Sequence, residues 1–271
     1  MNAARAAQLV WTRELAPGIF QQRLRLPQIA RQSRAGQFVH LLPGAGHLFR
    51  RAFSVYATDP KAGTFDVLHQ VLGEGTRGLS RLEPGAPVDT LGPLGKPFPK
   101  PPRGRRPVLV GGGLGMAPLR LWAVELLGST RAKSSAETRP VMLLGSRSTQ
   151  QAVAPYGLSA LGVRPVWASD DGSHGFHGHV IALLEHEIAR GKINPAQSVV
   201  YGCGPERMMA ALAESCARHA MPCFVSLERS MPCGFGVCMG CVIRMKDGAG
   251  YTTFRRVCRD GPVFDASEIV F

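Results

Sequence analysis

The sequence predicts an antiparallel β-barrel, then a doubly wound parallel α/β sheet, and finally a small C-terminal domain. Strand-like segments separated by glycine, proline and aspartate fill the first part of the 271-residue chain. Apolar strands that end in glycines then alternate with helical segments, which is typical of a parallel sheet. Cysteines gather near the end of the chain. We expect the three domains to cover residues 1–103, 104–226 and 227–271.

Six short segments rich in β-branched and aromatic residues predict the strands of the barrel. Glycine, proline or aspartate separates each segment from the next, as expected of turns. Strands this short and this evenly spaced favour a closed antiparallel barrel. One short helix fits at residues 75–82. The strands are expected at residues 8–15, 18–26, 36–42, 51–57, 64–72 and 86–92.

From residue 106 onward, the pattern changes to strands and helices in alternation. The run RPVLVGGG at 106–113 is continuously apolar, as is typical of a parallel strand buried on both faces. Further strands are expected at residues 140–146, 163–169, 198–204 and 222–227, with helices at residues 116–127, 149–161, 178–191 and 205–220. Two more strands, at 241–246 and 250–257, lie in the C-terminal region. Apolar residues at spacings of three and four predict core packing for the last helix: Met208, Met209, Leu212 and Cys216.

The composition limits the classes of function. Lys and Arg outnumber Asp and Glu by 32 to 19, which gives a formal net charge of +13, and a charge of this size attracts anionic partners. The basic residues are scattered, however, and no nucleic-acid-binding motif accompanies them. No apolar run reaches the ~18 residues of a membrane span, and no secretory signal is visible. We therefore expect a cytoplasmic protein without a nucleic-acid or membrane partner.

Four of the seven cysteines form the strongest motif in the chain. Zinc sites usually take their cysteines in two close pairs, whereas the spacing C-x4-C-x2-C-x16-C is that of plant-type [2Fe–2S] ligands. Glycines in the loop let the backbone approach the thiolates closely. We predict a [2Fe–2S] cluster, with zinc as the alternative. The expected ligands are Cys233, Cys238, Cys241 and Cys258, and the glycines are Gly234, Gly236 and Gly240.

Glycine-containing junctions indicate nucleotide binding. VLVGGGLGMAPL at 108–119 and YGCGPERM at 201–208 each join a predicted strand to a helix, and SDDGSHGFHGHV at 169–180 follows a third strand. All lie at the carboxyl ends of parallel strands, where such sheets bind ligands. In the barrel, an arginine in RRAFSVY at 50–56 and the glycine-rich helix start at 73–76 can together hold a pyrophosphate. Taken alone, the strand segment is a weak signal, and an ordinary turn is the favoured interpretation of GEGT at 73–76.

Together these motifs resemble, in order and over nearly the whole chain, the ferredoxin–NADP reductase superfamily. RAFS resembles its R-x-[Y/F]-S flavin motif, GGGLGMAPL its G-G-G-x-G-x-[A/T]-P-L loop, and YGCGPERMM its C-G-P-x-x-M motif. The segment DDGSHGFHGHV and the ending CRDGPVF at 258–264 are similar to one branch. That branch comprises the electron-transfer subunits of class 1B dihydroorotate dehydrogenases.

The resemblance implies an oxidoreductase subunit of pyrimidine biosynthesis that binds FAD, a [2Fe–2S] cluster and NAD. Its expected partner is an FMN-containing dihydroorotate dehydrogenase catalytic subunit, in a heterotetramer with two copies of each chain. Electrons would pass from the FMN through the cluster and the FAD to NAD+. The dihydroorotate site would then lie on the partner, and we expect no catalytic residue in this chain.

The resemblance also implies roles for individual residues. Arg51 would contact the FAD phosphate, Phe53 the flavin or its ribityl chain, and Ser54 the flavin ring. Many relatives have tyrosine where Phe53 stands, so one hydroxyl contact is missing here. The other expected FAD-binding residues are Ala52, Leu68, His69, Gln70, Gly75 and Thr76. The expected NAD-binding residues are Gly112, Gly113, Gly115, Asp171 and Cys203.

Two alternatives from different classes stay open at this point. The first is a relay subunit for another acceptor, such as a sulfide dehydrogenase, a hydrogenase or an NADPH:ferredoxin system, and the CRDGPVF ending favours the dihydroorotate branch over it. The second is a zinc-clipped nucleic-acid-binding module, which would leave the glycine-rich junctions unexplained.

Overall fold

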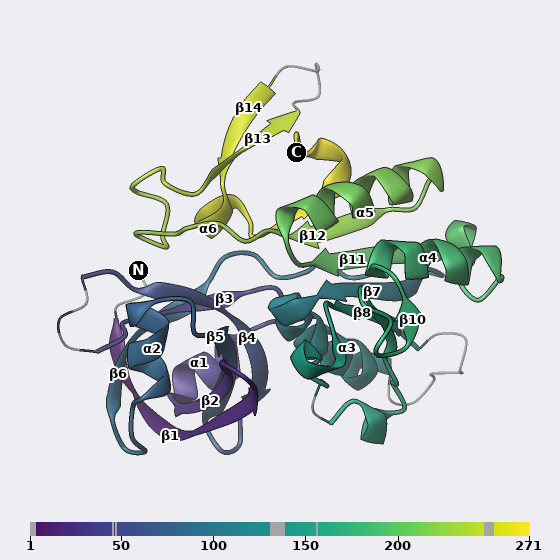
Figure 1. Cartoon of the computed structure of the whole chain (residues 1–271). Helices are drawn as coiled ribbons and strands as arrows, with labels where there is room; N and C mark the ends of the chain where they lie inside the picture. The colour runs from purple at the N-terminus through teal and green to yellow at the C-terminus, as the bar shows by residue number, and fades with distance from the viewer. Residues whose placement is uncertain (1–3, 45, 47, 131–138, 156, 247–251) are drawn as a thin grey trace.

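A computed structural model describes residues 4–44, 46, 48–130, 139–155, 157–246 and 252–271. Figure 1 shows a barrel at the N-terminus, an α/β sheet beside it, and a C-terminal segment that lies over both. We refer to residues 227–271 as the C-terminal segment. The start of the expected strand at 250–257 falls outside the described residues.

The barrel closes through six antiparallel strands in the order β1-β2-β5-β4-β3-β6. All six predicted segments are confirmed as strands: β1 (Arg5–Ala16), β2 (Ile19–Arg25), β3 (Phe38–Leu41), β4 (Arg51–Asp59), β5 (Thr64–Gln70) and β6 (Pro87–Leu94). The predicted helix is α2 (Glu74–Ser80). The sequence analysis missed the six-residue helix α1 (Pro27–Gln32). Its proline at the first helical position was the available signal.

The sheet has seven strands in the order β10-β9-β8-β7-β11-β12-β15. Its strands are β7 (Arg106–Gly112), β8 (Val141–Ser146), β9 (Val166–Ser169), β10 (Phe176–His177), β11 (Ser198–Cys203), β12 (Cys223–Ser226) and β15 (Val263–Asp265). All neighbours are parallel except β12 and β15, which run antiparallel. The chain order reverses between β7 and β11, and ligands bind at the carboxyl ends of strands beside such a reversal.

The helices of the sheet are α3 (Met116–Thr130), α4 (Val180–Ala189) and α5 (Glu206–Arg218). On α5, Met209, Leu212 and Cys216 are buried as predicted, but Met208 lies on the wall of a cavity instead of in the core. In the described part of the chain, no helix combines the length and the apolar character that a membrane crossing requires.

The predicted helix at 149–161 is wrong. The described residues of this stretch contain two short 3-10 helices, η2 (Thr149–Gln151) and η3 (Ser159–Leu161). Pro155 lies between them, and proline has no N–H for a continuing helix. Gly157 adopts φ +78°, a left-handed conformation that also ends a helix.

The C-terminal segment is attached to both the barrel and the sheet. It contains the antiparallel pair β13 (Val242–Lys246) and β14 (Thr252–Arg256), as well as α6 (Val257–Asp260) and η5 (Ala266–Glu268). The N–H of Lys96, just after the barrel, donates to the carbonyl of Gly261 at 2.6 Å. The last sheet strand, β15, also belongs to this segment, so its position is fixed by backbone hydrogen bonds on two sides.

An aromatic cluster joins the barrel to the sheet. The ring of Phe98, which follows β6, lies 6.0 Å from that of Trp122 on α3 and 5.6 Å from that of Tyr201 on β11. The hydroxyl of Tyr201 donates to the carbonyl of Pro99 at 3.0 Å. All three rings are buried, so this contact holds the two parts in one continuous core.

A charged network between α4 and α5 gives a test of the fold. The Glu185 carboxylate accepts hydrogen bonds from Ser215, Arg218 and His219, each at 2.7 Å. Burial raises its pKa, but these partners outweigh that effect and lower it to about 2. A carboxylate with a depressed pKa in the folded state stabilises the fold above its unfolded pKa of about 4.3, and this contribution is lost as the pH falls toward the folded value.

We expect Glu185→Gln to lower the free energy of unfolding by about 1 kcal/mol at pH 7, because the side chains are partly exposed and water screens the charges. The difference between variant and wild type should shrink below pH 4.3, which urea denaturation at several pH values measures. Glu214→Gln, at an exposed position of α5, is the matched control. An equal loss in both variants, or a pH-independent difference, would contradict the assignment.

Candidate functional site

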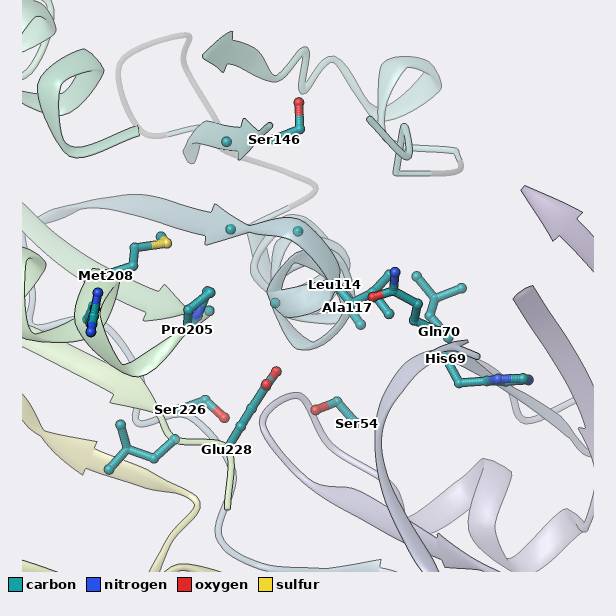
Figure 2. A pocket seen from close by; sticks show the side chains of 18 of the residues that line it. Ser54, His69, Gln70, Leu114, Ala117, Ser146, Pro205, Met208, Ser226 and Glu228 are labelled. Atoms are coloured by element: carbon teal, nitrogen blue, oxygen red, sulfur yellow. The ribbon is translucent and has the colours of Figure 1, made fainter. Parts of the chain in front are cut away.

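A cavity of about 1100 Å³ lies where the barrel meets the carboxyl ends of the parallel strands (Figure 2). Its walls come from β4, β5 and α2 on the barrel side and from the loops after β7, β8, β11 and β12 on the sheet side. Ten of the residues singled out in the sequence line it: Ala52, Phe53, Ser54, Leu68, His69, Gln70, Thr76, Gly112, Gly113 and Gly115. The fold thus brings segments from two different parts of the chain to one site.

On the barrel wall, His69 is buried and its ring nitrogens have no hydrogen-bond partner among the described residues. Its ring stacks on Phe20 with the centroids 5.7 Å apart, and Phe53 lies at the same distance on a tilt. Burial lowers the pKa of His69 to about 4, so the ring is neutral near pH 7. A neutral imidazole has one N–H donor and one acceptor, which a polar ligand in the cavity can satisfy.

Arg51 lies beside the start of α2. Its guanidinium covers Gly75 so closely that a Cβ at that position would lie 2.9 Å from an arginine nitrogen. The Thr76 hydroxyl accepts from the N–H groups of Leu72 at 2.9 Å and Gly73 at 3.3 Å, which fixes the turn. Arg51 and Gly75 do not contribute to the cavity wall itself. They place a positive charge next to Thr76, which does line the cavity, and this arrangement suits an anionic group.

The glycines after β7 have two different purposes. Gly113 has φ +54° and nothing within 4 Å of a built Cβ, so its backbone is open to a ligand. Gly115 instead packs against the backbone of the next junction, where a Cβ would lie 2.7 Å from the nitrogen of Gly204. Both glycines are among the residues that the sequence analysis expects to bind NAD. Only Gly113 has the free space for that, whereas Gly115 allows the loops after β7 and β11 to meet.

Cys203 and Asp171 lie outside the cavity wall. Cys203 ends β11 and is 1% exposed; burial and then the nearby Glu228 carboxylate raise the pKa of its thiol, which stays protonated. Asp171 is exposed and accepts from the hydroxyl of Ser173 at 2.6 Å, and this contact lowers its pKa. Its neighbour Asp170 does line the cavity.

Sequence reasoning missed several cavity residues, of which Glu228 is the most important. It follows β12 and lines the cavity, and burial of the carboxyl group raises its pKa. Figure 2 shows its carboxylate and the Ser54 hydroxyl turned toward the same space. Ser146, at the end of β8, is also on the wall, and its hydroxyl is buried without a partner among the described residues. Both residues end or follow parallel strands, so the strand-end rule was the signal that could have found them.

The four cysteines of the motif come together beside the barrel in two pairs. The thiols of Cys233 and Cys238 interact with each other, as do those of Cys241 and Cys258, and Cys258 also feels the charge of Cys233. Although burial raises it, the pKa of the Cys233 thiol falls to about 6, because backbone N–H groups of Cys238, Phe235 and Val237 point at the sulfur. Burial, followed by the Cys241 thiol, raises the pKa of Cys258 to about 12.

Backbone and side-chain contacts fix the cysteine loop. Gly234 and Gly236 have φ +80° and +91°, the left-handed region that favours glycine. Arg256 donates to the carbonyl of Gly236 at 2.9 Å and to the Asp260 carboxylate at 3.3 Å. The N–H groups of Gly240 and Cys258 donate to sulfurs at 3.4 Å. These contacts aim hydrogen-bond donors at thiolates, as the ligands of an anionic iron–sulfur core require.

The pairing of the thiols suits a two-iron centre. Within the described ranges, no group of three or more His, Cys, Asp or Glu side chains converges on a single ion position. A structural zinc ion needs four ligands around one point. In a [2Fe–2S] centre, by contrast, each of the two irons takes two of the four cysteines. Four cysteines with backbone N–H groups aimed at their sulfurs form a donor set that fits an iron–sulfur cluster.

Known proteins share both the sequence and the cysteine segment of this chain. Residues 228–270 match the iron–sulfur cluster binding domain of dihydroorotate dehydrogenase B. The electron transfer subunit of dihydroorotate dehydrogenase B (NAD(+)) from Bacillus caldolyticus is 38% identical over 250 residues, which is 91% of this chain and 90% of the relative. The corresponding subunit from Enterococcus faecalis strain V583 is 35% identical over 265 residues, 97% of this chain and 96% of the relative. The chain belongs to the family of dihydroorotate dehydrogenase B electron transfer subunits.

Solved structures agree with this family on the fold. An NADH-dependent reduced ferredoxin–NADP oxidoreductase, studied for flavin-based electron bifurcation, superposes with a TM-score of 0.82 at 25% identity and covers 100% of this chain and 91% of its own. A ferredoxin–NADP+ reductase from Neisseria gonorrhoeae, solved with bound FAD and NADP, has a TM-score of 0.66 at 19% identity over 80% of this chain and 91% of its own. The predicted barrel and parallel sheet are thereby confirmed as a ferredoxin reductase-like fold.

Family membership decides between the interpretations that the sequence left open. The matched residues 228–270 contain all four cysteines of the motif. A zinc-clipped nucleic-acid-binding module is therefore not supported. Relatives at 35–38% identity over most of the chain are dihydroorotate dehydrogenase B subunits, which favours this branch over a relay for another acceptor.

The tight contact at Gly115 gives a prediction. We expect Gly115→Ala to destabilise the protein by about 1–3 kcal/mol, the usual cost of forcing an extra carbon into a packed site. The new Cβ would meet the backbone of Cys203 and Gly204, which cannot move away as a flexible side chain can. Urea denaturation measures the loss.

The matched control is Gly128→Ala in α3, where a built Cβ meets nothing within 4 Å. This change should stabilise the helix by up to about 1 kcal/mol, since alanine is a better helix former than glycine. Equal stabilities of the two variants would show that Gly115 is not needed for packing.

Proposed function

We propose that this chain is the electron-transfer subunit of a dihydroorotate dehydrogenase, which relays electrons between a catalytic partner and NAD in pyrimidine biosynthesis. One observation carries the proposal: the barrel that forms the nucleotide cavity also holds the loop with the four paired cysteines. A flavin, when bound, exchanges electrons in pairs with a nicotinamide and singly with an iron–sulfur cluster. A chain that holds a flavin, a nicotinamide and an iron–sulfur cluster can therefore pass electrons between a one-electron carrier and a two-electron carrier.

The barrel side of the cavity is proposed to hold FAD. Arg51, with Gly75 and Thr76 beside it, would bind the pyrophosphate through charge-assisted hydrogen bonds. Phe53 and His69 would pack against the flavin, and the unpartnered ring of His69 would find its hydrogen-bond partner there. The remaining wall residues would enclose the isoalloxazine: Ala52, Ser54, Leu68 and Gln70.

The sheet side of the cavity is proposed to hold NAD. The open backbone of Gly113 faces the space after β7, with Gly112 and Gly115 shaping the same loop. Asp170 on the wall would repel the 2′-phosphate of NADP and accept from the ribose hydroxyl of NAD. The sequence analysis placed Asp171 among the NAD-binding residues, and the position of Asp170 on the wall makes Asp170 the better candidate. Cys203 would support the nicotinamide end from behind Gly115.

Cys233, Cys238, Cys241 and Cys258 are proposed as the ligands of the [2Fe–2S] cluster. A catalytic partner must reach that cluster, and the loop offers it an apolar surface. Three apolar side chains of the loop are exposed: Phe235 by 53%, Val237 by 72% and Met239 by 52%. Cys238, which lies between Val237 and Met239 in the sequence, is exposed as well. Exposed apolar side chains gathered in one loop are typical of protein–protein contacts. We propose that this loop docks on the FMN-containing catalytic subunit, with two copies of each chain in the assembly.

The test is the cofactor content of anaerobically purified protein. We expect about two irons and one FAD per chain, a visible spectrum of flavin plus cluster, and a low-temperature EPR signal after reduction. Mixing with an FMN-containing dihydroorotate dehydrogenase should give NAD+ reduction that depends on dihydroorotate. Zinc in place of iron, without a bound flavin, would overturn the proposal.

For the cluster, we expect Cys238→Ser to abolish electron transfer from the partner to NAD+ while FAD stays bound. The thiolate of Cys238 is lost, but no residue of the FAD cavity changes. Iron content, flavin content and turnover are the measurements. Cys216→Ala, which removes a buried thiol from α5, is the control and should keep its iron. Wild-type transfer in Cys238→Ser would refute the ligand assignment.

For the flavin, we expect Arg51→Ala to weaken FAD binding by about 1–3 kcal/mol, the range for a lost hydrogen bond to a charged group. Fluorescence titration of FAD into deflavinated protein measures the change. Arg50→Ala is the control with the same change in net charge, since Arg50 pairs with Asp89 at 2.7 Å, whereas the atoms that cover Gly75 beside Thr76 belong to Arg51. Equal affinities of the two variants would remove Arg51 from the FAD site.

A further inference from the structure

His40 on β3 is a buried histidine without an explained role. Its side chain is 0% exposed, and within the described residues neither ring nitrogen has a hydrogen-bond partner. Leaving a buried donor or acceptor unpaired costs about 1–3 kcal/mol, and buried polar groups in native proteins almost always have a partner. The two nitrogens of His40 therefore indicate a hydrogen-bond partner outside the described protein atoms.

The ring of His40 lies against the cysteine loop. A Cβ built on Gly234 would meet Cε1 of the ring first and would lie 2.6 Å from its Nδ1 and 2.8 Å from its Nε2, so the edge of the ring between the two nitrogens lies against the loop backbone. Gly234 follows Cys233 directly in the sequence. Figure 1 shows β3 on the side of the barrel that faces the C-terminal segment. The histidine is thus a barrel residue whose polar edge meets the loop of the proposed cluster.

His40 contacts the cysteine loop, while its neighbour on the same face of β3 contacts the FAD cavity. Val39 and Leu41 point into the buried barrel core, whereas Phe38 and His40 share the opposite face of β3, with ring centroids 5.7 Å apart. Phe38 lines the cavity, but His40 does not. Of the two sites, the cysteine loop is therefore the one that the His40 ring touches.

The cysteine sulfurs are acceptors that this loop offers beside its backbone carbonyls, and Cys233 stands directly before Gly234. A histidine ring has at least one N–H in either tautomer. Backbone N–H groups already point at the Cys233 sulfur, so donors converge on this part of the loop. Hydrogen bonds to the sulfurs of an iron–sulfur cluster stabilise its more negative, reduced form and so raise its reduction potential.

We propose that His40 donates a ring N–H hydrogen bond to a sulfur of the [2Fe–2S] cluster beside Cys233, and that it positions the loop and raises the cluster's reduction potential. This inference rests on the cluster in the proposed function and deepens it. His40 acts through the cluster ligands and is a positioning residue, not a ligand or a catalytic residue.

The main experiment is a redox titration of the full chain, loaded with its cofactors and followed by EPR. We expect His40→Leu to shift the reduction equilibrium of the cluster about tenfold toward the oxidised form, which corresponds to a potential lower by about 59 mV for a one-electron couple. His40→Gln keeps an N–H donor and should recover at least half of the shift. The FAD potential should stay the same in both variants.

His69→Leu is the matched control. His69 is the other buried histidine whose ring nitrogens are both unpartnered among the described residues, but it lines the FAD cavity. Its loss should leave the cluster potential unchanged. This comparison separates an effect of His40 on the cluster from a general effect of removing a buried imidazole from the barrel.

A second measurement does not depend on the potential. Protein labelled with 15N only at histidine should show a 15N coupling to the reduced cluster in pulsed EPR, and His40→Leu should lose it. If His40→Leu does not fold, this coupling in the wild type and the potential of His40→Gln decide the matter.

The outcomes are distinguishable. An unchanged cluster potential together with no 15N coupling overturns the role of His40 while the proposed function stands. A shift of the FAD potential alone assigns His40 to the flavin and also overturns the inference. Wild-type protein that binds no iron refutes the proposed function itself.

Discussion

The attachment of the C-terminal segment to the barrel is the contact on which the site depends. The N–H of Lys96, just after the barrel, donates to the carbonyl of Gly261 at 2.6 Å. Strand β15 then adds to the sheet beside β12. Backbone hydrogen bonds need no particular side chain, so they fix the path of the segment over both neighbours. As a result, the cysteine loop has one position relative to the cavity, and an electron carrier in either place has a fixed distance to the other.

Two buried histidines on the barrel show how one residue type can meet two different groups. His69 and His40 are both buried with unpartnered rings, and burial lowers the pKa of each to about 4. His69, on β5, faces the cavity, and His40, on β3, faces Gly234 of the cysteine loop. A neutral ring can donate without bringing a charge into the core. The strand on which each histidine lies decides which proposed cofactor it serves.

The close approach of a glycine backbone to a distant segment of the chain is the second feature that shapes the site. Gly115 lets the loops after β7 and β11 touch, and Gly234 lets the cysteine loop rest on the His40 ring. In both places a Cβ would overlap with atoms of a distant segment. Glycine here serves the contact between two parts of the protein, whereas at Gly113 it leaves the backbone open to a ligand. The same residue type in one glycine-rich motif therefore has different physical reasons at neighbouring positions.

The sequence by itself determined the six barrel strands, the alternating strands and helices of the sheet, and the cysteine spacing. These depend on local periodicity, turn residues and ligand spacing, which neighbouring residues express directly. It also pointed to the barrel side of the cavity through RAFS and to the sheet side through the glycine-rich junctions. The helix expected at 149–161 failed where Pro155 and Gly157 interrupt the chain, although both breakers were visible in the sequence.

Only the tertiary structure decided which distant residues meet. Glu228 and Ser146 join the cavity because the ends of β12 and β8 come to the same edge of the sheet. Asp170, and not Asp171, lines the cavity because adjacent residues of the loop after β9 face different ways. His40 reaches the cysteine loop because a barrel strand and a segment near the end of the chain pack together. Contacts between residues so far apart leave no periodic signal in the sequence, since they are set by how whole elements pack.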